Sequence, residues 1–525
     1  MGFLVYSGVL GGAFIFDDEL LIERNELIRS LGNIPQFFSS SIDSGAFIND
    51  GNFFRPLQMV IYTIIFSMFQ LTSTLPYHLV PIVLHGMNSV LVYALIRNTG
   101  IRREASLAGA LLFLVHPVQV QAVAYISGLA DPLGLFLLLS GILVLFHQRF
   151  AHHRPLLRYG GALLLFLLAM LAKESFIIAG PLVFVLAAIY WRDRDDSEFR
   201  MRMAAVAATI LLSISYLVLK FTVFNFAGTF GLAQEESAYS TNMLVRITTF
   251  ISSVWDYFVL VIFPRDLYYE KPLNTAYSLE SVRGMFGLLA IALTGIAATA
   301  AARAGNRKLL TAIAFIVIPM LPYTGIVPLN AYYLEHWLYV PMTGLAILAA
   351  LVLDRLHAKE WVMILFILLL ALLGLRTYVR AAQWGDPAEF YRNELGYTTD
   401  SARIWNNLAN IYSRTGQHDK AIEAYERAIE LRDDYPQTRH NLGNLYAMQG
   451  RYQEAFDQFY LSLTKDPNFI YSHDKMQRLF SLTEGEEERA RAFERFIARI
   501  RAGGNVTLEE INTVLDITPS PEPEQ

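Results

Sequence analysis

Long apolar runs without Asp, Glu, Lys or Arg fill most of the chain before about residue 385. A helix needs roughly 20 apolar residues to cross about 30 Å of hydrocarbon. The pattern therefore predicts a polytopic, all-α bundle of membrane helices rather than a signal peptide and a soluble body. The runs lie at 56–96, 105–130, 132–147, 159–172, 175–191, 203–219, 284–302, 309–334, 337–353 and 361–375.

Basic loops between these runs predict the orientation, because Lys and Arg concentrate on the cytoplasmic side of a membrane. We place five such loops inside, at 97–103, 149–158, 192–202, 303–308 and 355–359. Asp17 and the tail after Arg380 then face outward, to the periplasm in a bacterium or the lumen of the endoplasmic reticulum in a eukaryote. With 1–16 as a short first span, this predicts about eleven spans.

If two further apolar segments spanned the membrane, the five basic loops could not all lie inside. Residues 56–74 and 242–264 are interpreted as interfacial or re-entrant segments on the outer side. If 242–264 spans instead, the loop at 303–308 moves outside. Residues 1–16 are short for a span, so either they thin the bilayer or the true start of the protein lies further upstream.

The frequency of charged residues divides the chain into an apolar part and a polar part. Hydrophobic residues make up 54% and charged residues 17%, with a mean hydropathy of +0.36. Charged residues are much more frequent from Asp386 onward than before it, and the net charge turns from positive to negative at that boundary. We expect a membrane domain at 1–385, a polar domain at 386–502, and a disordered acidic end at 503–525 containing Pro519, Pro521 and Pro523.

Composition also excludes several classes of protein. A soluble enzyme carries roughly a quarter of charged residues, so a soluble nucleotide-binding fold is excluded. The absence of cysteine excludes structural disulfides, thiol catalysis and Cys-ligated zinc. The net charge of −5 argues against a basic nucleic-acid binder.

The polar domain repeats itself at an offset of about 34 residues, the period of helix–turn–helix tetratricopeptide (TPR) repeats. A third copy is worn, and we interpret the segment around Met476 and Phe480 as a capping helix. Each repeat needs a neighbour to bury its apolar face, so we expect the domain to pack against the membrane part or a partner. The matching positions are Leu408, Ala409, Tyr412, Gly416, Ala421 and Tyr425, which recur as Leu442, Gly443, Tyr446, Gly450, Ala455 and Phe459.

Four asparagines follow the same offset: Asn407 and Asn410, then Asn441 and Asn444. A spacing of three puts each pair on one helix face. Such amides can hydrogen-bond the backbone of an acceptor peptide in a groove, or they can simply be solvated.

Ionisable residues at the outer mouth of the bundle are the candidates for chemistry. Asp17 and Asp18 follow the first span, and the alternative is that they open a helix as a cap and first turn. Asp131 before Pro132 has the same alternative. All three face the outer side in the predicted topology.

Four further candidates have a plain structural alternative each. Lys173 can pair with a phosphate or snorkel to the interface, and Arg55 can do the same or open a helix. His116 precedes a proline that can simply kink the helix. Glu335 lies in a Tyr- and Trp-rich loop that can form an aromatic belt.

Taken in order, these motifs resemble the GT-C glycosyltransferases, and with the TPR repeats they resemble most the transmembrane-and-TPR protein O-mannosyltransferases and their bacterial relatives. The resemblance covers almost the whole chain. Its motifs are Phe14-x-Phe16-Asp17-Asp18-Glu19, Phe54-Arg55-Pro56-Leu57, Tyr77-His78-Leu79-Val80 with His85, His116-Pro117, Ile126-Ser127-Gly128-x-Ala130-Asp131, Lys173-Glu174-Ser175 and Glu335-x-x-Leu338-Tyr339-x-Pro341.

The resemblance implies a membrane enzyme that moves a sugar from a polyprenyl phosphate to a hydroxyl of a protein or glycan acceptor on the outer face. Asp18 or Asp17 would be the base that deprotonates that hydroxyl, or would hold a divalent metal with Asp131. Lys173 and Arg55 would neutralise the leaving phosphate. Asp131, His116 and Glu335 would complete the substrate site, with no nucleic acid involved.

This sequence departs from the family pattern at four positions. Gln119 and Gln121 stand where the TPR-bearing relatives usually have His and Glu, Leu129 stands for Arg, and His336 stands for Arg. The second hypothesis is therefore a membrane-anchored TPR scaffold with an inactive transferase core. A transporter ranks last, because the two halves of the chain show no matching broken helices.

Overall fold

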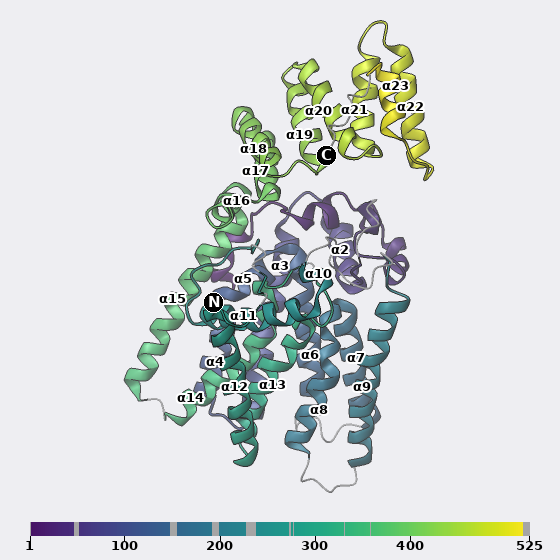
Figure 1. Cartoon of the computed structure of the whole chain (residues 1–525). Helices are drawn as coiled ribbons and strands as arrows, with labels where there is room; N and C mark the ends of the chain where they lie inside the picture. Colours follow the sequence, from purple (N-terminus) through teal and green to yellow (C-terminus); the bar gives the residue numbers. More distant parts are fainter. Residues whose placement is uncertain are drawn as a thin grey trace. The chain divides into compact units, whose positions relative to one another are not determined.

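A computed structural model describes residues 2–46, 52–146, 155–191, 199–226, 238–271, 275–276, 278–329, 331–356 and 359–517. Every regular element in these ranges is helical, which confirms the all-α prediction (Figure 1). The chain divides into two compact units, Met1–Asp386 and Pro387–Gln525, and each is described by itself. Four loop arginines used to predict orientation lie outside the described residues, as do the terminal prolines: Arg149, Arg154, Arg192 and Arg194, and Pro519, Pro521 and Pro523.

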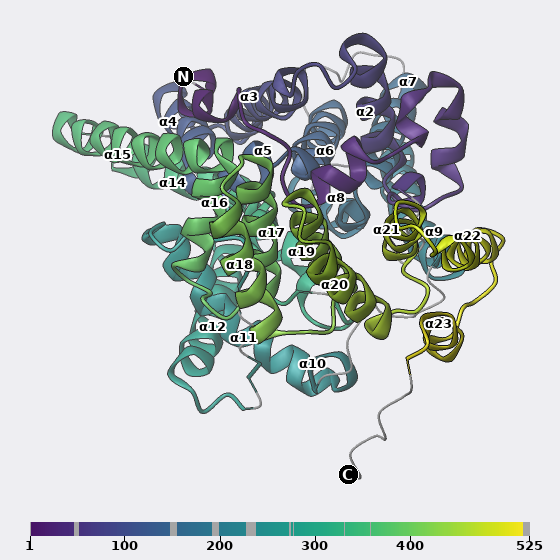
Figure 2. The same cartoon turned by 90° about the horizontal axis from the view of Figure 1, so that it is seen from above.

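The first unit is a bundle of long helices joined by short helical turns (Figures 1 and 2). The strongest packing joins α6 to α7, α13 to α14, α11 to α12, α4 to α14, and α3 to both α4 and α6. Its α-helices are α1 (Gly2–Val5), α2 (Pro56–Phe69), α3 (Leu75–Asn98), α4 (Arg103–Val115), α5 (Val120–Ala124), α6 (Ala130–Phe146), α7 (Pro155–Ala172), α8 (Ala179–Tyr190), α9 (Phe199–Thr222), α10 (Ala238–Thr241), α11 (Met243–Ile262), α12 (Val282–Arg303), α13 (Arg307–Val317), α14 (Pro341–Arg355) and α15 (Glu360–Gly385).

Six described helices are long and apolar enough to cross a membrane, and a seventh span arises if the bent pair Arg103–Val115 and Pro117–Ala124 counts as one. The bend of 49° falls at His116-Pro117, as a proline break predicts. Three shorter apolar helices add to these: Pro56–Phe69, Leu157–Ala172 and Glu174–Tyr190. The count of eleven spans stays a prediction.

The first predicted span is not one continuous helix. α1 ends at Val5 and a 3₁₀ turn follows at Ser7–Val9. Gly8 and Gly12 follow the interruption, and a Cβ on either would lie 2.8 Å from backbone atoms of α15, at Ala382 and Gly385. The glycines let this segment approach α15 at backbone distance, which a regular helix with side chains could not do.

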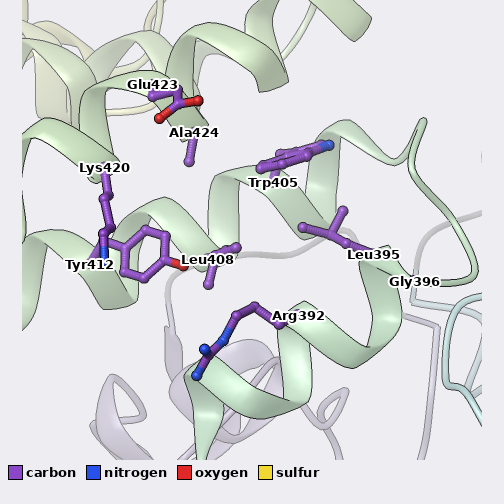
Figure 3. A pocket seen from close by; sticks show the side chains of 9 residues that line it. All are labelled: Arg392, Leu395, Gly396, Trp405, Leu408, Tyr412, Lys420, Glu423 and Ala424. Carbon is purple, nitrogen blue, oxygen red and sulfur yellow. The ribbon is translucent and has the colours of Figure 1, made fainter.

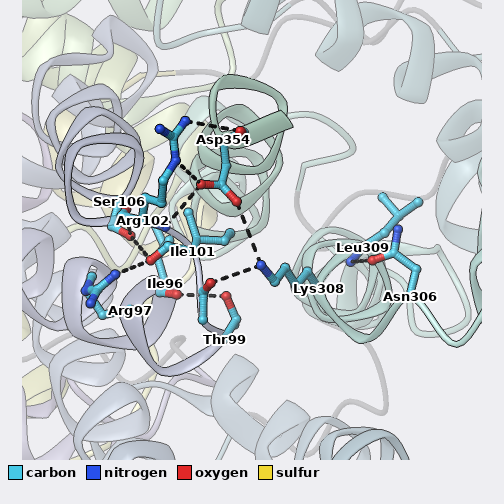
Figure 4. A network of polar contacts seen from close by, with 11 residues as sticks. Ile96, Arg97, Thr99, Ile101, Arg102, Ser106, Asn306, Lys308, Leu309 and Asp354 are labelled. Atoms are coloured by element: carbon cyan, nitrogen blue, oxygen red, sulfur yellow. Dashed lines mark hydrogen bonds and ion pairs between the residues drawn. The ribbon is translucent and has the colours of Figure 1, made fainter. Parts of the chain in front are cut away.

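Two of the basic loops, 97–103 and 303–308, meet at Asp354 near the C-terminal end of α14 (Figure 4). Nε of Arg102 donates to Asp354 at 2.8 Å, and Nζ of Lys308 lies 3.8 Å from the other oxygen of that carboxylate. Lys308 also donates to the carbonyl of Gly100 at 3.0 Å. These contacts are those expected if the loops at 97–103, 303–308 and 355–359 share one side of the membrane.

α11 is long enough to span, but its contacts lie with segments at the opposite end from those loops. Nε of Arg246 donates to the carbonyl of Gly325 at 2.6 Å, and the hydroxyl of Tyr257 donates to that of Leu334 at 3.2 Å. Both acceptors belong to the loop after α13, a helix that starts at the basic end. The contacts favour the interpretation of 242–264 as an interfacial or re-entrant segment.

The second unit stacks antiparallel helix pairs, α17 with α18 and α19 with α20, as the repeat period predicts. The turns inside the pairs contain Gly416 and Gly450, which both have a positive φ, a conformation that favours glycine. Its helices are α16 (Pro387–Leu395), α17 (Ala402–Arg414), α18 (His418–Leu431), α19 (Pro436–Met448), α20 (Tyr452–Lys465), α21 (Ile470–Ser481), α22 (Glu487–Arg501) and α23 (Leu508–Leu515).

Two expectations about the end of this unit are wrong. The worn third copy is a complete pair, α21 and α22, rather than one capping helix, because Met476, Phe480 and Phe493 still supply its buried contacts. Residues 508–515 form α23 rather than disordered chain. A capping box between Thr507 and Glu510 starts that helix, which buries Ile511 in the core of the unit.

Candidate active site

The acidic loop after the first segment separates its two aspartates. Asp17 is exposed, whereas Asp18 is 1% exposed. One carboxylate oxygen of Asp18 accepts from both the N–H (2.8 Å) and the hydroxyl of Ser127, and the other accepts from the N–H of Ile15 at 3.2 Å. Asp18 makes no side-chain capping bond to the turn that follows it. The helix-cap alternative is therefore wrong for Asp18, which instead ties the first loop to the second.

The backbone just before this pair is strained. Phe16 has a positive φ, a region that residues other than glycine rarely adopt. Its ring stacks on Tyr269 with centroids 4.6 Å apart, and the N–H of Asp17 donates to the hydroxyl of Tyr125 at 3.1 Å. Strain held by surrounding contacts is common at functional sites. These contacts hold the backbone of Phe16 and Asp17 in place.

Burial raises the pKa of Asp18 to about 7, although the hydrogen bonds from Ser127 and Ile15 act in the opposite direction. The negative charge of Asp17 adds a small further increase. A carboxyl group with this pKa changes its charge near neutral pH, a property that a general base or acid needs.

Asp131 and Lys173 form a buried ion pair. Nζ of Lys173 lies 2.7 and 2.8 Å from the two carboxylate oxygens, and the side chains are 7% and 6% exposed for Lys173 and Asp131. α6 begins one residue earlier, at Ala130, so Asp131 is inside the helix and not its N-cap. The snorkelling alternative for Lys173 is wrong as well, because its ammonium group faces Asp131.

Arg55 has a carboxylate partner of its own in Glu174. Nε of Arg55 lies 3.1 Å from Glu174, whose other oxygen accepts from the N–H of Phe54 at 2.7 Å. The charge of Arg55 also acts on Asp131. The four groups Arg55, Asp131, Lys173 and Glu174 therefore form one cluster in which the charges cancel.

Glu335 is 1% exposed and has its partners outside that cluster. It accepts from the N–H of Tyr268 at 2.7 Å and lies 3.4 Å from Nζ of Lys271. Tyr332 and Tyr333 beside it are buried, so this part of the loop is not an exposed aromatic belt. Lys271 carried no signal in the sequence, because a single lysine in a long polar loop resembles any solvated one.

His116 is engaged at both ring nitrogens. Nε2 lies 3.0 Å from the carbonyl of Val261, and Nδ1 accepts from the N–H of Val118 at 3.3 Å. The structure thus gives His116 a local role at the break between α4 and α5 and a link to α11.

Two of the positions that depart from the family pattern are in contact. Oε1 of Gln121 accepts from the N–H of His336 at 2.8 Å. Burial, together with the positive charges of Lys173 and Arg55, holds the pKa of His336 well below its usual range. Gln119 is fully buried, and neither polar atom of its side chain has a partner among the described residues.

A metal site was one interpretation of Asp17, Asp18 and Asp131. Among the residues that the structure describes, no group of three or more His, Cys, Asp or Glu side chains is gathered to hold a metal ion. Asp131 pairs with Lys173 and Asp18 with Ser127, so the three aspartates do not converge on one point.

One hydrogen bond between the repeated asparagines joins α17 to α19. Oδ1 of Asn410 accepts from the hydroxyl of Tyr425 at 2.6 Å and from Nδ2 of Asn441 at 3.0 Å. Nδ2 of Asn444 lies 2.9 Å from Nε2 of His440. Within the described part of the unit, Nδ2 of Asn407 and Oδ1 of Asn441 have no partner, so these atoms remain available to a ligand.

A separate cavity of about 520 Å³ lies at the start of the TPR stack (Figure 3). Trp405 and Tyr412 of α17 line it, with Lys420 of α18 and Arg392 of α16. α16 has 9 residues against the 14 of α18, so it covers only part of the first repeat.

The first unit combines membrane-length apolar helices with buried acidic and basic groups, and the second unit is a TPR stack. This combination is typical of a membrane enzyme or a membrane-anchored scaffold. Comparison with known proteins narrows this class. Residues 400–466 match the tetratricopeptide repeat family. The chain is similar in sequence to several transmembrane-and-TPR protein O-mannosyl-transferases, which confirms the resemblance that its ordered motifs predicted.

Three of these relatives illustrate the extent of the similarity. Protein O-mannosyl-transferase F38B6.6 of Caenorhabditis elegans is 25% identical over 79% of this chain and 59% of its own length. TMTC4 of Mus musculus is 25% identical over 80% and 64%, and TMTC3 of Homo sapiens 21% identical over 79% and 49%. The chain thus spans about half to two thirds of the length of these curated relatives.

Proposed function

We propose that this protein is an integral membrane glycosyltransferase of the mannosyltransferase-like GT-C type. It transfers a sugar from a polyprenyl-phosphate carrier to a hydroxyl of a protein or glycan acceptor on the outer face of the membrane. The observation that carries the proposal is the hydrogen-bonded link from Asp18 to Ser127, four residues before Asp131 and its partner Lys173. That link holds the first acidic loop beside the second, and the names of the relatives support the same chemistry.

Asp17 and Asp18 have different parts in this reaction. An acceptor hydroxyl is a poor nucleophile, and a carboxylate that takes its proton during attack accelerates transfer. Asp17 is exposed and therefore within reach of an acceptor, so we assign it the proton-accepting role. Asp18 positions the loop through Ser127, and its raised pKa lets its carboxyl group bind a proton near neutral pH.

Lys173 and Arg55 stabilise the phosphate that leaves. Each already has a carboxylate partner, Asp131 and Glu174, so an entering phosphate competes for the same donors. Charge-assisted hydrogen bonds from Lys and Arg to phosphate are strong in a buried site. Glu335 and His116 are proposed to shape this end of the bundle, His116 by holding α11 in place.

The TPR unit is proposed to present the acceptor. The free amide atoms of Asn407 and Asn441 can hydrogen-bond the backbone of an extended peptide, while Asn410 joins α17 to α19 through Asn441. In the predicted topology this unit lies in the periplasm or the lumen, in the same compartment as Asp17.

The second candidate is a membrane-anchored TPR scaffold without transfer activity. The observation that favours it is that both candidate phosphate ligands, Lys173 and Arg55, are already neutralised by carboxylates. Gln121 and His336 are neutral at positions where the relatives usually have charged residues, which also favours the scaffold.

Transfer from a polyprenyl-phosphate sugar to a peptide, by full-length protein in nanodiscs, separates the two candidates. We expect transfer from at least one donor sugar, mannose first, and a loss of at least about 100-fold in Asp17→Asn, the low end for loss of a general base. Glu26→Gln, which removes an exposed carboxylate from the same outer segment, is the matched control. Wild-type protein that transfers no sugar from any donor supports the scaffold.

A further inference from the structure

A second cavity lies in the first unit, between α11, α12 and the loop that joins them. It measures about 390 Å³, and aromatic side chains such as Trp255, Tyr268 and Tyr333 line it. Four charged residues also line it, two acidic and two basic: Asp256, Asp266, Lys271 and Arg283. None of these groups belongs to the acidic loop or to the cluster around Lys173.

The charged groups are arranged so that one donor and one acceptor remain open. Arg283 pairs with Asp256 through Nε (3.0 Å) and Nη2, and within the described ranges its Nη1 has no acceptor. The exposed carboxylate of Asp266 likewise has no partner among the described residues. Nζ of Lys271 lies 3.3 Å from the centroid of the Tyr268 ring. Lys271 itself is the cation over that ring, and it also lies 3.4 Å from Glu335, so the protein already balances its charge.

The balance of charge selects the kind of head group. Arg283 and Lys271 are already paired, with Asp256 and Glu335. Asp266 adds a further negative charge, so a purely anionic group loses at the carboxylates much of what it gains at the cations. A group that carries both a phosphate and an ammonium ion gains from both.

The surface beside the cavity suits lipid chains. Phe263 at the end of α11 is 71% exposed, and Val282 and Met285 at the start of α12 are 61% and 54% exposed. Large apolar residues gathered in this way mark contact with a membrane or a partner. Both helices are also apolar and long enough to lie in a bilayer.

We propose that this cavity binds the head group of a zwitterionic phospholipid. The phosphate lies toward Nη1 of Arg283, the ammonium ion toward Asp266, and the acyl chains along the exposed face of α11 and α12. Such a lipid would hold α11 against the outer end of the bundle. The inference concerns binding alone, so it does not depend on sugar transfer.

The test is native mass spectrometry of the full-length protein released from nanodiscs of equal parts phosphatidylethanolamine and phosphatidylglycerol, with polyprenyl-phosphate mannose added. We expect retention of phosphatidylethanolamine over phosphatidylglycerol by about two- to fivefold, the ratio that one ion contact supplies. Asp266→Lys should reverse the preference, because it makes the cavity positive.

Glu280→Lys is the matched control, since Glu280 is exposed nearby but does not line the cavity. It should leave the preference unchanged, and the melting temperatures of both variants confirm that they fold. The proposal is overturned if both variants shift the preference alike, if the wild type retains neither phospholipid selectively, or if it retains polyprenyl-phosphate mannose in place of phosphatidylethanolamine.

Discussion

Asp18 accepts two hydrogen bonds from Ser127, one from its N–H and one from its hydroxyl, although the two residues are far apart in the sequence. This contact joins two motifs that the sequence could only place on the same side of a membrane. Because Ser127 lies four residues before Asp131, the contact places the first loop beside the segment that carries the buried ion pair with Lys173.

Ser127→Ala tests this contact. The substitution removes the hydroxyl donor and leaves the N–H donor, so the buried carboxylate of Asp18 loses one of its three hydrogen bonds. We expect a loss of about 1–3 kcal/mol in the free energy of unfolding, as for a buried polar group left short of a partner. Chemical denaturation in detergent measures it. Ser67→Ala, at an exposed position of α2, is the control and should change stability little.

The raised pKa of Asp18 predicts a pH dependence of stability. The carboxyl binds a proton more tightly in the folded state, with a pKa of about 7, than in the unfolded state, where it is 3.8. Its contribution to stability is therefore fully present below about pH 4 and is lost as the pH rises through 7.

Asp18→Asn removes this dependence while keeping the shape of the side chain. The melting temperature of the variant, relative to wild type, should increase from pH 5 to pH 8. Glu26→Gln supplies the baseline for loss of one exposed carboxylate. A difference between Asp18→Asn and wild type that stays flat over this range would contradict the raised pKa.

The ion pair of Asp131 and Lys173 predicts a strongly non-additive double substitution. Lys173→Met alone leaves a buried, unpaired carboxylate and should cost about 3–5 kcal/mol of stability. Replacing both residues, as Lys173→Met with Asp131→Leu, should restore most of that stability, because apolar side chains replace a buried pair at little cost.

Sugar transfer should not return with stability in the double variant, since neither group is then left to meet the leaving phosphate. Full transfer by a stable double variant would assign the pair a purely structural role. Denaturation curves and transfer assays on the same preparations measure both quantities.

The sequence predicts the fold class and repeat period well, because hydrophobic length and a fixed repeat offset are local signals. It predicts less about the site. Asp17 and Asp18 are equivalent in the pattern, and only tertiary packing against Ser127 separates the exposed one from the buried one. Glu174 and Lys271, the partners of Arg55 and Glu335, could not be predicted, since ion pairs between distant segments leave no periodic trace.

The hydrogen bonds of the repeated asparagines predict different effects of substituting Asn407 and Asn410. Asn407→Ala should weaken acceptor peptide binding by about 1–3 kcal/mol with little change in stability, because its Nδ2 bonds no other described residue. Asn410→Ala should lower stability, because it loses the bonds to Tyr425 and Asn441. Fluorescence titration with a labelled acceptor peptide and thermal melts measure the two effects. Unchanged peptide affinity in the combined Asn407→Ala, Asn441→Ala variant would leave these residues as solvated or structural groups.

The topology gives the last prediction, and the absence of cysteine makes it direct, because any single cysteine introduced is the only thiol in the chain. Glu26→Cys at the acidic end and Arg103→Cys at the basic end should react with a membrane-impermeant maleimide from opposite sides of sealed vesicles. Met243→Cys and Phe263→Cys mark the two ends of α11, where both residues are exposed. If α11 lies along the outer face, as its contacts with Gly325 and Leu334 favour, both should label from the same side as Glu26→Cys. If α11 crosses the membrane, its ends label from opposite sides, and Glu280→Cys then labels with only one of them. Labelling of Glu26→Cys and Arg103→Cys from one side would overturn the orientation, and with it the placement of Asp17 in the outer compartment.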